Sequence, residues 1–397
     1  MAALAERIQH LSESQTIKMA RISREIAANG YDVINLSLGE PDFPTPINIK
    51  EAAKKAIDDG FTFYTPISGY SDLRLAISNK LKNENGLEYQ IDQIVVSTGA
   101  KQSISNVVLS LINPGDEVLI SKPYWVSYIE IIKLAEGKTV LMDSTIDNDF
   151  KITPEQLRRA ITPKTKMFIF SSPCNPTGTV YTKEELKGLA EVFAAHPDIW
   201  VLSDEIYEYI NFLGKHQSIA QFQEIREQVI VVNGLSKGFA MTGWRIGYIA
   251  APREVAQACD KIQGQITSGT CSISQKAAEA ALNGERGPAI AMRDAYLRRR
   301  DLVIKLLSEV QGIKLNLPQG AFYVFPDISY YFGKSDGETM IKTANDLCMY
   351  FLHKAHVSIV TGAAFGEPNC VRISYAAADE KLVEAIRRIK LALSYLK

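Results

Sequence analysis

The side chains best suited to covalent chemistry lie in the run Asn233-Gly234-Leu235-Ser236-Lys237 and just beyond it. Lys237 follows the apolar stretch at residues 229–232, and Arg245 comes eight positions later. An amine held in a pocket beside cations has a lowered pKa and can attack an aldehyde to form an imine. A lone lysine after a strand is usually a surface group, so this interpretation depends on the neighbouring motifs.

Three polar groups upstream follow apolar stretches in the same way. Asn175 begins Asn-Pro-Thr-Gly, Asp204 follows residues 200–203, and Tyr207 comes three positions later. A carboxylate can keep a pyridine nitrogen protonated, and a phenol and an amide can bind a phenolic oxygen. Taken singly, the acid could be a helix cap and the asparagine a turn residue. The ordered set predicts a Schiff-base site for pyridoxal 5′-phosphate (PLP), with Lys237, Asp204 and Tyr207 as catalytic candidates.

A phosphate site is predicted at Gly99-Ala100-Lys101, which opens a helical pattern. The free N–H groups and positive dipole end of a helix suit a dianion. Arg245 could add a bidentate contact to the same phosphate. The structural alternatives are a simple turn and a salt-bridged surface arginine.

Two further candidates would contact the cofactor ring or the substrate. Trp125 could stack on the ring, although a tryptophan is by default a core residue. Arg372 lies among apolar neighbours in Val371-Arg372-Ile373-Ser374-Tyr375. Because a buried guanidinium is costly unless it is paired, a substrate carboxylate is a reasonable partner for Arg372.

Short apolar runs alternate with helical patterns between about residues 92 and 250. The runs predicted as strands are 94–98, 117–120, 139–142, 166–170, 200–203, 229–232 and 246–250. This alternation predicts an α/β fold with a mostly parallel seven-stranded sheet between helices. Ligands bind at the carboxyl ends of such strands, where Gly99, Asn175, Asp204 and Lys237 fall.

The pattern changes beyond about residue 285. A long charged helix is predicted at 289–309, followed by strand-like pieces at 320–325, 357–360 and 370–375 and a helix at 379–396. We interpret this region as a smaller α+β domain. The predicted division is a large PLP-binding domain at 46–285 and a small domain formed by 1–45 and 286–397.

Composition narrows the function classes. The net charge of −1 gives no sign of nucleic-acid or membrane-surface binding, and the apolar runs are too short to cross a bilayer. Five cysteines without a Cys-x-x-Cys pair favour reduced thiols in a cytoplasmic protein over a metal or disulfide role. The absence of Gly-x-Gly-x-x-Gly weakens a dinucleotide-binding interpretation.

With these residues in view, the chain resembles the class I, fold-type-I PLP-dependent aminotransferases, in particular the bacterial aspartate aminotransferase subgroup. The resemblance runs from residues 35–42, Asn-Leu-Ser-Leu-Gly-Glu-Pro-Asp, to residues 371–375. Its most specific stretch is 236–245, Ser-Lys-Gly-Phe-Ala-Met-Thr-Gly-Trp-Arg.

The resemblance implies a role for each matching residue. Lys237 would be the Schiff-base lysine and proton shuttle, and Asp204 the partner of the pyridine nitrogen. The remaining implied roles belong to Asn175 and Tyr207 on the phenolic oxygen, Trp125 on the ring, Arg372 and Gly39 on the substrate α-carboxylate, and Tyr64 on the phosphate in the neighbouring subunit. The last role implies a homodimer with shared active sites.

The chain departs from the family pattern in two places. Many members carry a phosphate-binding serine where this chain has Gly234, with Ser236 two positions on. The segment that holds an arginine for the distal carboxylate in animal-type members is 261–270 here. It offers Gln263, Gln265 and Ser268, with Lys261 as its only cation.

The predicted activity is amino transfer by a ping-pong mechanism, with aspartate and 2-oxoglutarate as the first choice of substrates. Prephenate or an aromatic amino acid comes next, because no residue is assigned to the distal group. A carbon–sulfur β-lyase of the same fold is the alternative chemistry. A ligand-sensing regulator is disfavoured, since the family-like motifs begin at Asn35.

Overall fold

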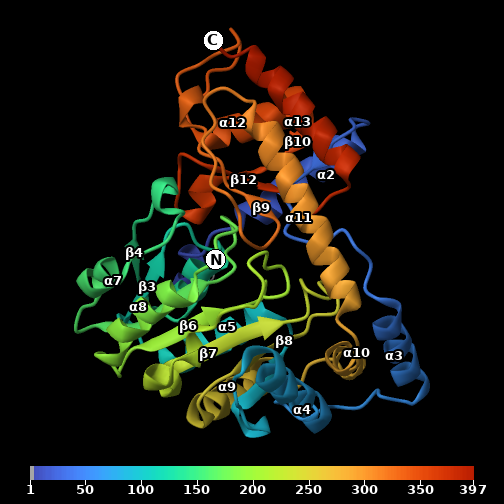
Figure 1. Ribbon diagram of the computed structural model, residues 1–397, viewed down its shortest axis with the longest axis vertical. Coiled ribbons are helices and arrows are strands. Elements are labelled where there is room, and N and C mark those ends of the chain that lie inside the picture. Colours follow the sequence, from blue (N-terminus) through green and yellow to red (C-terminus); the bar gives the residue numbers. More distant parts are fainter. Residues whose placement is uncertain (1–3) are drawn as a thin grey trace.

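A seven-stranded sheet forms the centre of the computed structural model, which describes residues 4–397 (Figure 1). The strand order is β2-β8-β7-β6-β5-β3-β4. The strands are β2 (Ile94–Ser97), β3 (Glu117–Ser121), β4 (Lys138–Met142), β5 (Thr165–Ser171), β6 (Trp200–Asp204), β7 (Val229–Gly234) and β8 (Gly247–Ala250). β8 runs antiparallel to the other six strands, which are parallel to one another. The predicted α/β class with a mostly parallel seven-stranded sheet is therefore confirmed.

The sheet is buried on both faces, which explains why its strands are unbroken apolar runs in the sequence. In β7, Val229 and Val231 enter one core, whereas Ile230 and Val232 enter the other. The first core is closed by α4 (Ser71–Lys80), α8 (Lys183–Ala194) and α10 (Ser272–Asn283). The second is closed by α5 (Ala100–Leu111), α6 (Ser127–Leu134) and α9 (Arg253–Ile266).

Local capping sets the start of two helices. Thr182 accepts the Glu185 N–H at 3.2 Å, and the Glu185 carboxylate accepts the Thr182 N–H at 2.7 Å, so α8 begins at Lys183. This reciprocal pair satisfies two N–H groups that a helix end otherwise leaves free. The same arrangement at Thr153 starts α7 (Pro154–Ala160), which has a proline in its first turn.

The remaining strands form two smaller sheets. β11 (Val360–Thr361), β12 (Val371–Ser374) and β9 (Tyr323–Val324) are antiparallel in that order, and β1 (Ile34–Asn35) pairs in parallel with β10 (Val357–Ser358). All of these strands except β11 share a separate apolar core with residues from α2 (Gln15–Ala28), α11 (Gly287–Ser308), α12 (Ala344–Tyr350) and α13 (Asp379–Ser394). Tyr207 and Ile210, just beyond β6, also enter this core. Val360 of β11 lies in a smaller apolar cluster.

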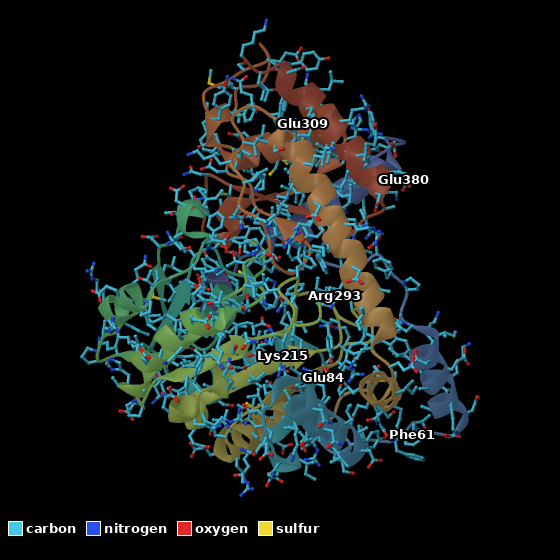
Figure 2. All side chains as sticks on the ribbon, in the orientation of Figure 1. Phe61, Glu84, Lys215, Arg293, Glu309 and Glu380 are labelled. Carbon is cyan, nitrogen blue, oxygen red and sulfur yellow. The ribbon has the colours of Figure 1, made fainter. Side chains whose placement is uncertain are left out.

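Helix α11 runs from beside α10 to the end of the molecule formed by α12 and α13 (Figure 1). Arg286, at its N-cap, lies 2.7 Å from Glu84, and Glu309, at its C-cap, accepts a 2.6 Å bond from Lys390 of α13 (Figure 2). Partly exposed pairs contribute only about 0–1 kcal/mol each. The buried Tyr296 and Val303 therefore fix α11 more than its ion pairs do.

Two further helices, α1 (Glu6–Gln9) and α3 (Ile47–Asp58), come early in the sequence. Among residues 4–397, no helix combines the length and the apolar character needed to cross a membrane.

Candidate active site

A cavity of about 440 Å³ opens at the carboxyl edge of the sheet, where β5, β6 and β7 end. The predicted residues that line it are Gly39, Ala100, Lys101, Trp125, Asn175, Asp204, Tyr207, Lys237, Arg245 and Arg372. Gly99 adjoins it as the N-cap of α5. Tyr64 does not line the cavity and is 98% exposed on this single chain.

The antiparallel direction of β8 explains why Lys237 and Arg245 lie at the same edge of the sheet. The connection between β7 and β8 leaves and re-enters the sheet at the same edge, because the two strands form an antiparallel pair. Both residues belong to this connection. A parallel β8 would have required a crossover to the opposite edge.

Lys237 is partly exposed to the cavity, and its Nζ donates a 2.5 Å hydrogen bond to the Gly39 carbonyl. Burial of the amine lowers its pKa to about 8, and the cations Arg372 and Arg245 act in the same direction. Glu40 and Asp204 oppose them. A large share of the amine is therefore neutral, and nucleophilic, at pH 8.

Asp204 ends β6 as a buried carboxylate. Tyr128, from α6, donates a 2.7 Å hydrogen bond to its Oδ2, and the Ile206 N–H approaches its Oδ1 at 3.3 Å. Burial raises the pKa of Asp204 to about 6 in spite of these donors. A cationic ring nitrogen beside it would favour the ionised form.

Arg372, on β12, is buried without a counter-ion. Its Nη1 donates to Asn175 Oδ1 at 2.9 Å, and its Nη2 donates to the Ser37 carbonyl at 2.6 Å. The Nε is buried and has no partner, and no carboxylate within residues 4–397 forms a salt bridge with the guanidinium. An uncompensated buried charge is costly, so the site favours an incoming carboxylate.

A pair of phenols connects Tyr207 to the arginine side of the cavity. The hydroxyls of Tyr207 and Tyr323 are 2.7 Å apart, and the Tyr323 ring lies 4.6 Å from the Arg372 guanidinium. Burial, together with Tyr323, raises the pKa of Tyr207 well above its usual value. Tyr207 is therefore a neutral donor at physiological pH.

Close packing of glycines keeps the start of α5 open to a ligand. A Cβ at Gly99 would lie 2.3 Å from Arg245 Nη2, and one at Gly247 would lie 2.2 Å from the Ala100 nitrogen. The guanidinium of Arg245 thus sits directly against the helix N-terminus, next to N–H groups that suit an anion.

The departure at Gly234 has a packing reason. A Cβ there would lie 2.8 Å from the Ile246 carbonyl, because β7 and β8 are in close contact at this point. Ser236, two positions beyond Gly234, lines the cavity, so the cavity wall still carries a hydroxyl.

Part of the cavity wall was not found from the sequence. None of residues 261–270 lines the cavity, and Gln263 donates to the Ile67 and Val96 carbonyls. Ser14, Thr16 and Ile17, at the start of α2, line it instead. The polar run Ser12–Thr16 ahead of a helix was the only signal available for them.

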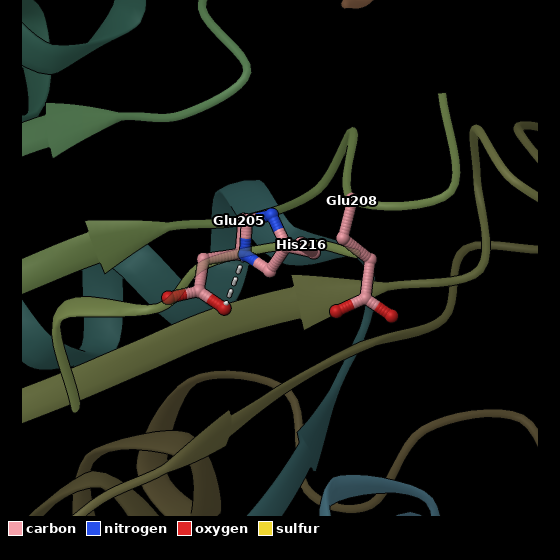
Figure 3. A group of neighbouring side chains, drawn as sticks. All are labelled: Glu205, Glu208 and His216. Carbon is pink, nitrogen blue, oxygen red and sulfur yellow. Dashed lines mark hydrogen bonds and ion pairs between the residues drawn. The ribbon is translucent and has the colours of Figure 1, made fainter. Parts of the chain in front are cut away.

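A second polar cluster, Glu205, Glu208 and His216, lies behind the end of β6 (Figure 3). Two carboxylates and an imidazole could hold a metal ion at this spacing. Their donors are already present: Lys80 and Asn233 on Glu208, and Ser203, Ser218 and His216 on Glu205. Although burial acts against it, these donors hold the pKa of Glu205 below its usual value. We therefore interpret the cluster as a hydrogen-bonded support for the strand end.

Comparison with known proteins identifies the class. The family model for aminotransferase class I and II matches residues 31–389, so the chain belongs to this family. The resemblance drawn from the sequence is confirmed, and the protein is an aminotransferase.

Two relatives and two solved structures show which aminotransferases the chain is similar to. The chain is 47% identical to the aspartate/prephenate aminotransferase of Cereibacter sphaeroides over 393 residues, which cover 98% of both proteins. It is also 47% identical, over 100% of its own length and 84% of the relative, to the bifunctional aspartate aminotransferase and glutamate/aspartate-prephenate aminotransferase of Petunia hybrida. The crystal structure of the aspartate aminotransferase from Rhizobium meliloti matches with a TM-score of 0.97 at 41% identity, covering 100% of both chains. The Thermus thermophilus aspartate aminotransferase with maleate matches at 0.93 and 38% identity, covering 99% of this chain and 100% of that one.

The raised pKa of Asp204 predicts a pH dependence of stability in the cofactor-free protein. Between the unfolded value near 3.8 and the folded value near 6, the folded state holds a proton that the unfolded state has lost. Stability therefore falls as pH rises through this window, by about 3 kcal/mol in all. Asp204→Asn removes this contribution. In urea denaturation, the unfolding free energy of the variant should therefore rise relative to that of the parent between pH 4 and pH 7. A difference in unfolding free energy that stays constant over this range would contradict the assignment.

Proposed function

We propose that this aminotransferase binds PLP at Lys237 and transfers the amino group of L-aspartate to 2-oxoglutarate. One observation carries the proposal: a desolvated amine, a buried carboxylate and a buried arginine without a counter-ion line the same cavity. These are the groups that an imine, a pyridine nitrogen and a substrate carboxylate each require.

The donor set fits the phosphate and the ring of PLP. Ala100 offers an N–H group at the start of α5, and Arg245 offers a guanidinium beside it. The Gly99 N–H already donates to the Ser97 carbonyl at 2.8 Å. Trp125 lines the same cavity, and its edge-to-face contact with Tyr128, at 5.4 Å between ring centroids, fixes its position. Asp204 is available for the ring nitrogen. When bound, PLP supplies the electron sink that makes the α-proton of an amino acid acidic.

The protein's own groups would then hold the substrate and move its proton. Lys237, with its lowered pKa, can accept a proton from the α-carbon and return it one position away. Arg372 would bind the α-carboxylate, with Asn175 and Gly39 beside it. Tyr207 would donate to the phenolic oxygen of the cofactor.

Dicarboxylate specificity needs one further cation. The cations that line the cavity are Lys101, Lys237, Arg245 and Arg372. If the last three serve the imine, the phosphate and the α-carboxylate, Lys101 is left for the distal group. Its Nζ lies 5.1 Å above the Trp125 ring, and it forms no salt bridge in the described part of the chain. We therefore propose Lys101 as the distal-carboxylate ligand, with a contact to the phosphate as its alternative role.

Prephenate is the second candidate substrate. The names of several relatives include it, and the chain is 42–47% identical to them. Prephenate carries two carboxylates, so the same pair of cations, Arg372 and Lys101, could hold it.

We also propose a homodimer in which Tyr64 reaches the phosphate of the partner subunit. Phe63 and Tyr64 are 83% and 98% exposed on this chain, which is unusual for adjacent aromatic residues unless another surface covers them. The division into domains at 46–285 and at 1–45 with 286–397 stays a proposal, supported by the separate apolar cores. A cytoplasmic location fits the five free thiols, and cell fractionation would test it.

A panel of amino donors tests the substrate proposal. Lys101→Ala should raise the KM for aspartate about tenfold or more, because a charged hydrogen bond is lost. The KM for phenylalanine should change little, and Lys101→Arg, which keeps the charge, should remain close to the parent. An equal rise for every donor, together with weaker PLP binding, would assign Lys101 to the phosphate instead.

Sedimentation tests the shared site. The particle mass should be about twice the 44.0 kDa of one chain. Tyr64→Phe should keep that mass while weakening PLP about tenfold, since one hydrogen bond to a charged group is removed. A parent protein that sediments as a monomer, or a Tyr64→Phe variant that binds PLP as tightly as the parent, would exclude the proposed role.

A further inference from the structure

Tyr323 lines the cavity and is not among the residues predicted from the sequence. Tyr323 lies on β9, is fully buried, and pairs with Ser374 of β12. Its hydroxyl is 2.7 Å from that of Tyr207. A Cβ at Gly39 would lie 2.3 Å from this hydroxyl, so the glycine leaves the room that the phenol occupies.

Packing explains the Tyr323 ring but not its hydroxyl. The ring contacts Phe322 at 4.8 Å and the Arg372 guanidinium at 4.6 Å, and a phenylalanine would make both contacts. The hydroxyl adds one interaction, with Tyr207, and both tyrosines line the cavity.

The direction of that hydrogen bond is set by what Tyr207 does. On this chain alone, either phenol could be the donor. A phenol has a single proton to donate. If Tyr207 gives its proton to the phenolic oxygen of the cofactor, it must accept from Tyr323. A donor that also accepts a hydrogen bond is polarised and donates more strongly.

We propose that Tyr323 is a positioning residue that acts through Tyr207: its hydroxyl donates to Tyr207, fixes the direction of the Tyr207 proton, and strengthens the Tyr207 hydrogen bond to the cofactor's phenolic oxygen. The proposal rests on the proposed function, because it requires PLP in the cavity. It links β9, which carries the ring under Arg372, to the residue that tunes the cofactor.

A pH titration of the visible absorbance of bound PLP tests the relay without measuring turnover. Hydrogen bonds to the phenolic oxygen stabilise its charge and so lower the pH of the absorbance change. Tyr323→Phe should raise that midpoint by about half to one pH unit, the size expected for the loss of a modest hydrogen bond. In a Tyr207→Phe background the same substitution should move it by less than about 0.2 unit, because the residue through which it acts is gone.

The matched comparisons make the outcome decisive. Tyr323→Phe keeps the ring on Arg372, so the affinity for maleate should stay within about twofold of the parent. If Tyr323→Phe fails to fold, Gly39→Ala displaces the hydroxyl without removing it and should raise the midpoint only when Tyr207 is present. An unchanged midpoint, or an equal shift with and without the Tyr207 hydroxyl, overturns the relay while PLP binding stands. A parent chain that shows no visible absorbance with PLP overturns the proposed function as well.

Discussion

Three charged side chains share one cavity, and the cost of removing charge from water governs their surroundings. Lys237, Asp204 and Arg372 come from three different parts of the chain, yet each is desolvated at the same edge of the sheet. The protein meets this cost only in part. The pKa of Asp204 is raised to about 6, the pKa of Lys237 is lowered to about 8, and Arg372 lacks an anion. A pyridoxal ring, an aldehyde and a carboxylate would relieve these three unfavourable states in turn.

The sheet makes this arrangement possible. Parallel strands bring Asn175 and Asp204 to one edge, and the reversal at β8 returns the chain to that edge between Lys237 and Arg245. At Gly99, Gly247 and Gly39, neighbouring segments of the cavity wall pack so closely that a side chain would not fit. The Glu205 cluster just beyond β6 is held by its own hydrogen-bond donors, and the Glu205 charge helps to raise the pKa of Asp204.

Much of this could be predicted from the sequence because the signals were local. Strands buried on both faces stand out as continuous apolar runs, and polar residues at their ends mark the ligand edge. Tyr128, Tyr323, Ser14 and Thr16 could not be found in this way. Tyr323 is 116 residues from Tyr207, and Tyr128 is 76 residues from Asp204, so their contacts depend on how whole elements dock. The antiparallel direction of β8 could not be predicted either, since a buried strand has the same apolar composition in either direction.

Reduction of the PLP-loaded protein with borohydride, followed by mapping of the labelled peptide, tests the assignment of Lys237 most directly. We expect one pyridoxyl group per chain, on Lys237, and none on Lys101, although both lysines line the cavity. A label on any other side chain, or no label on a folded protein saturated with PLP, would contradict it.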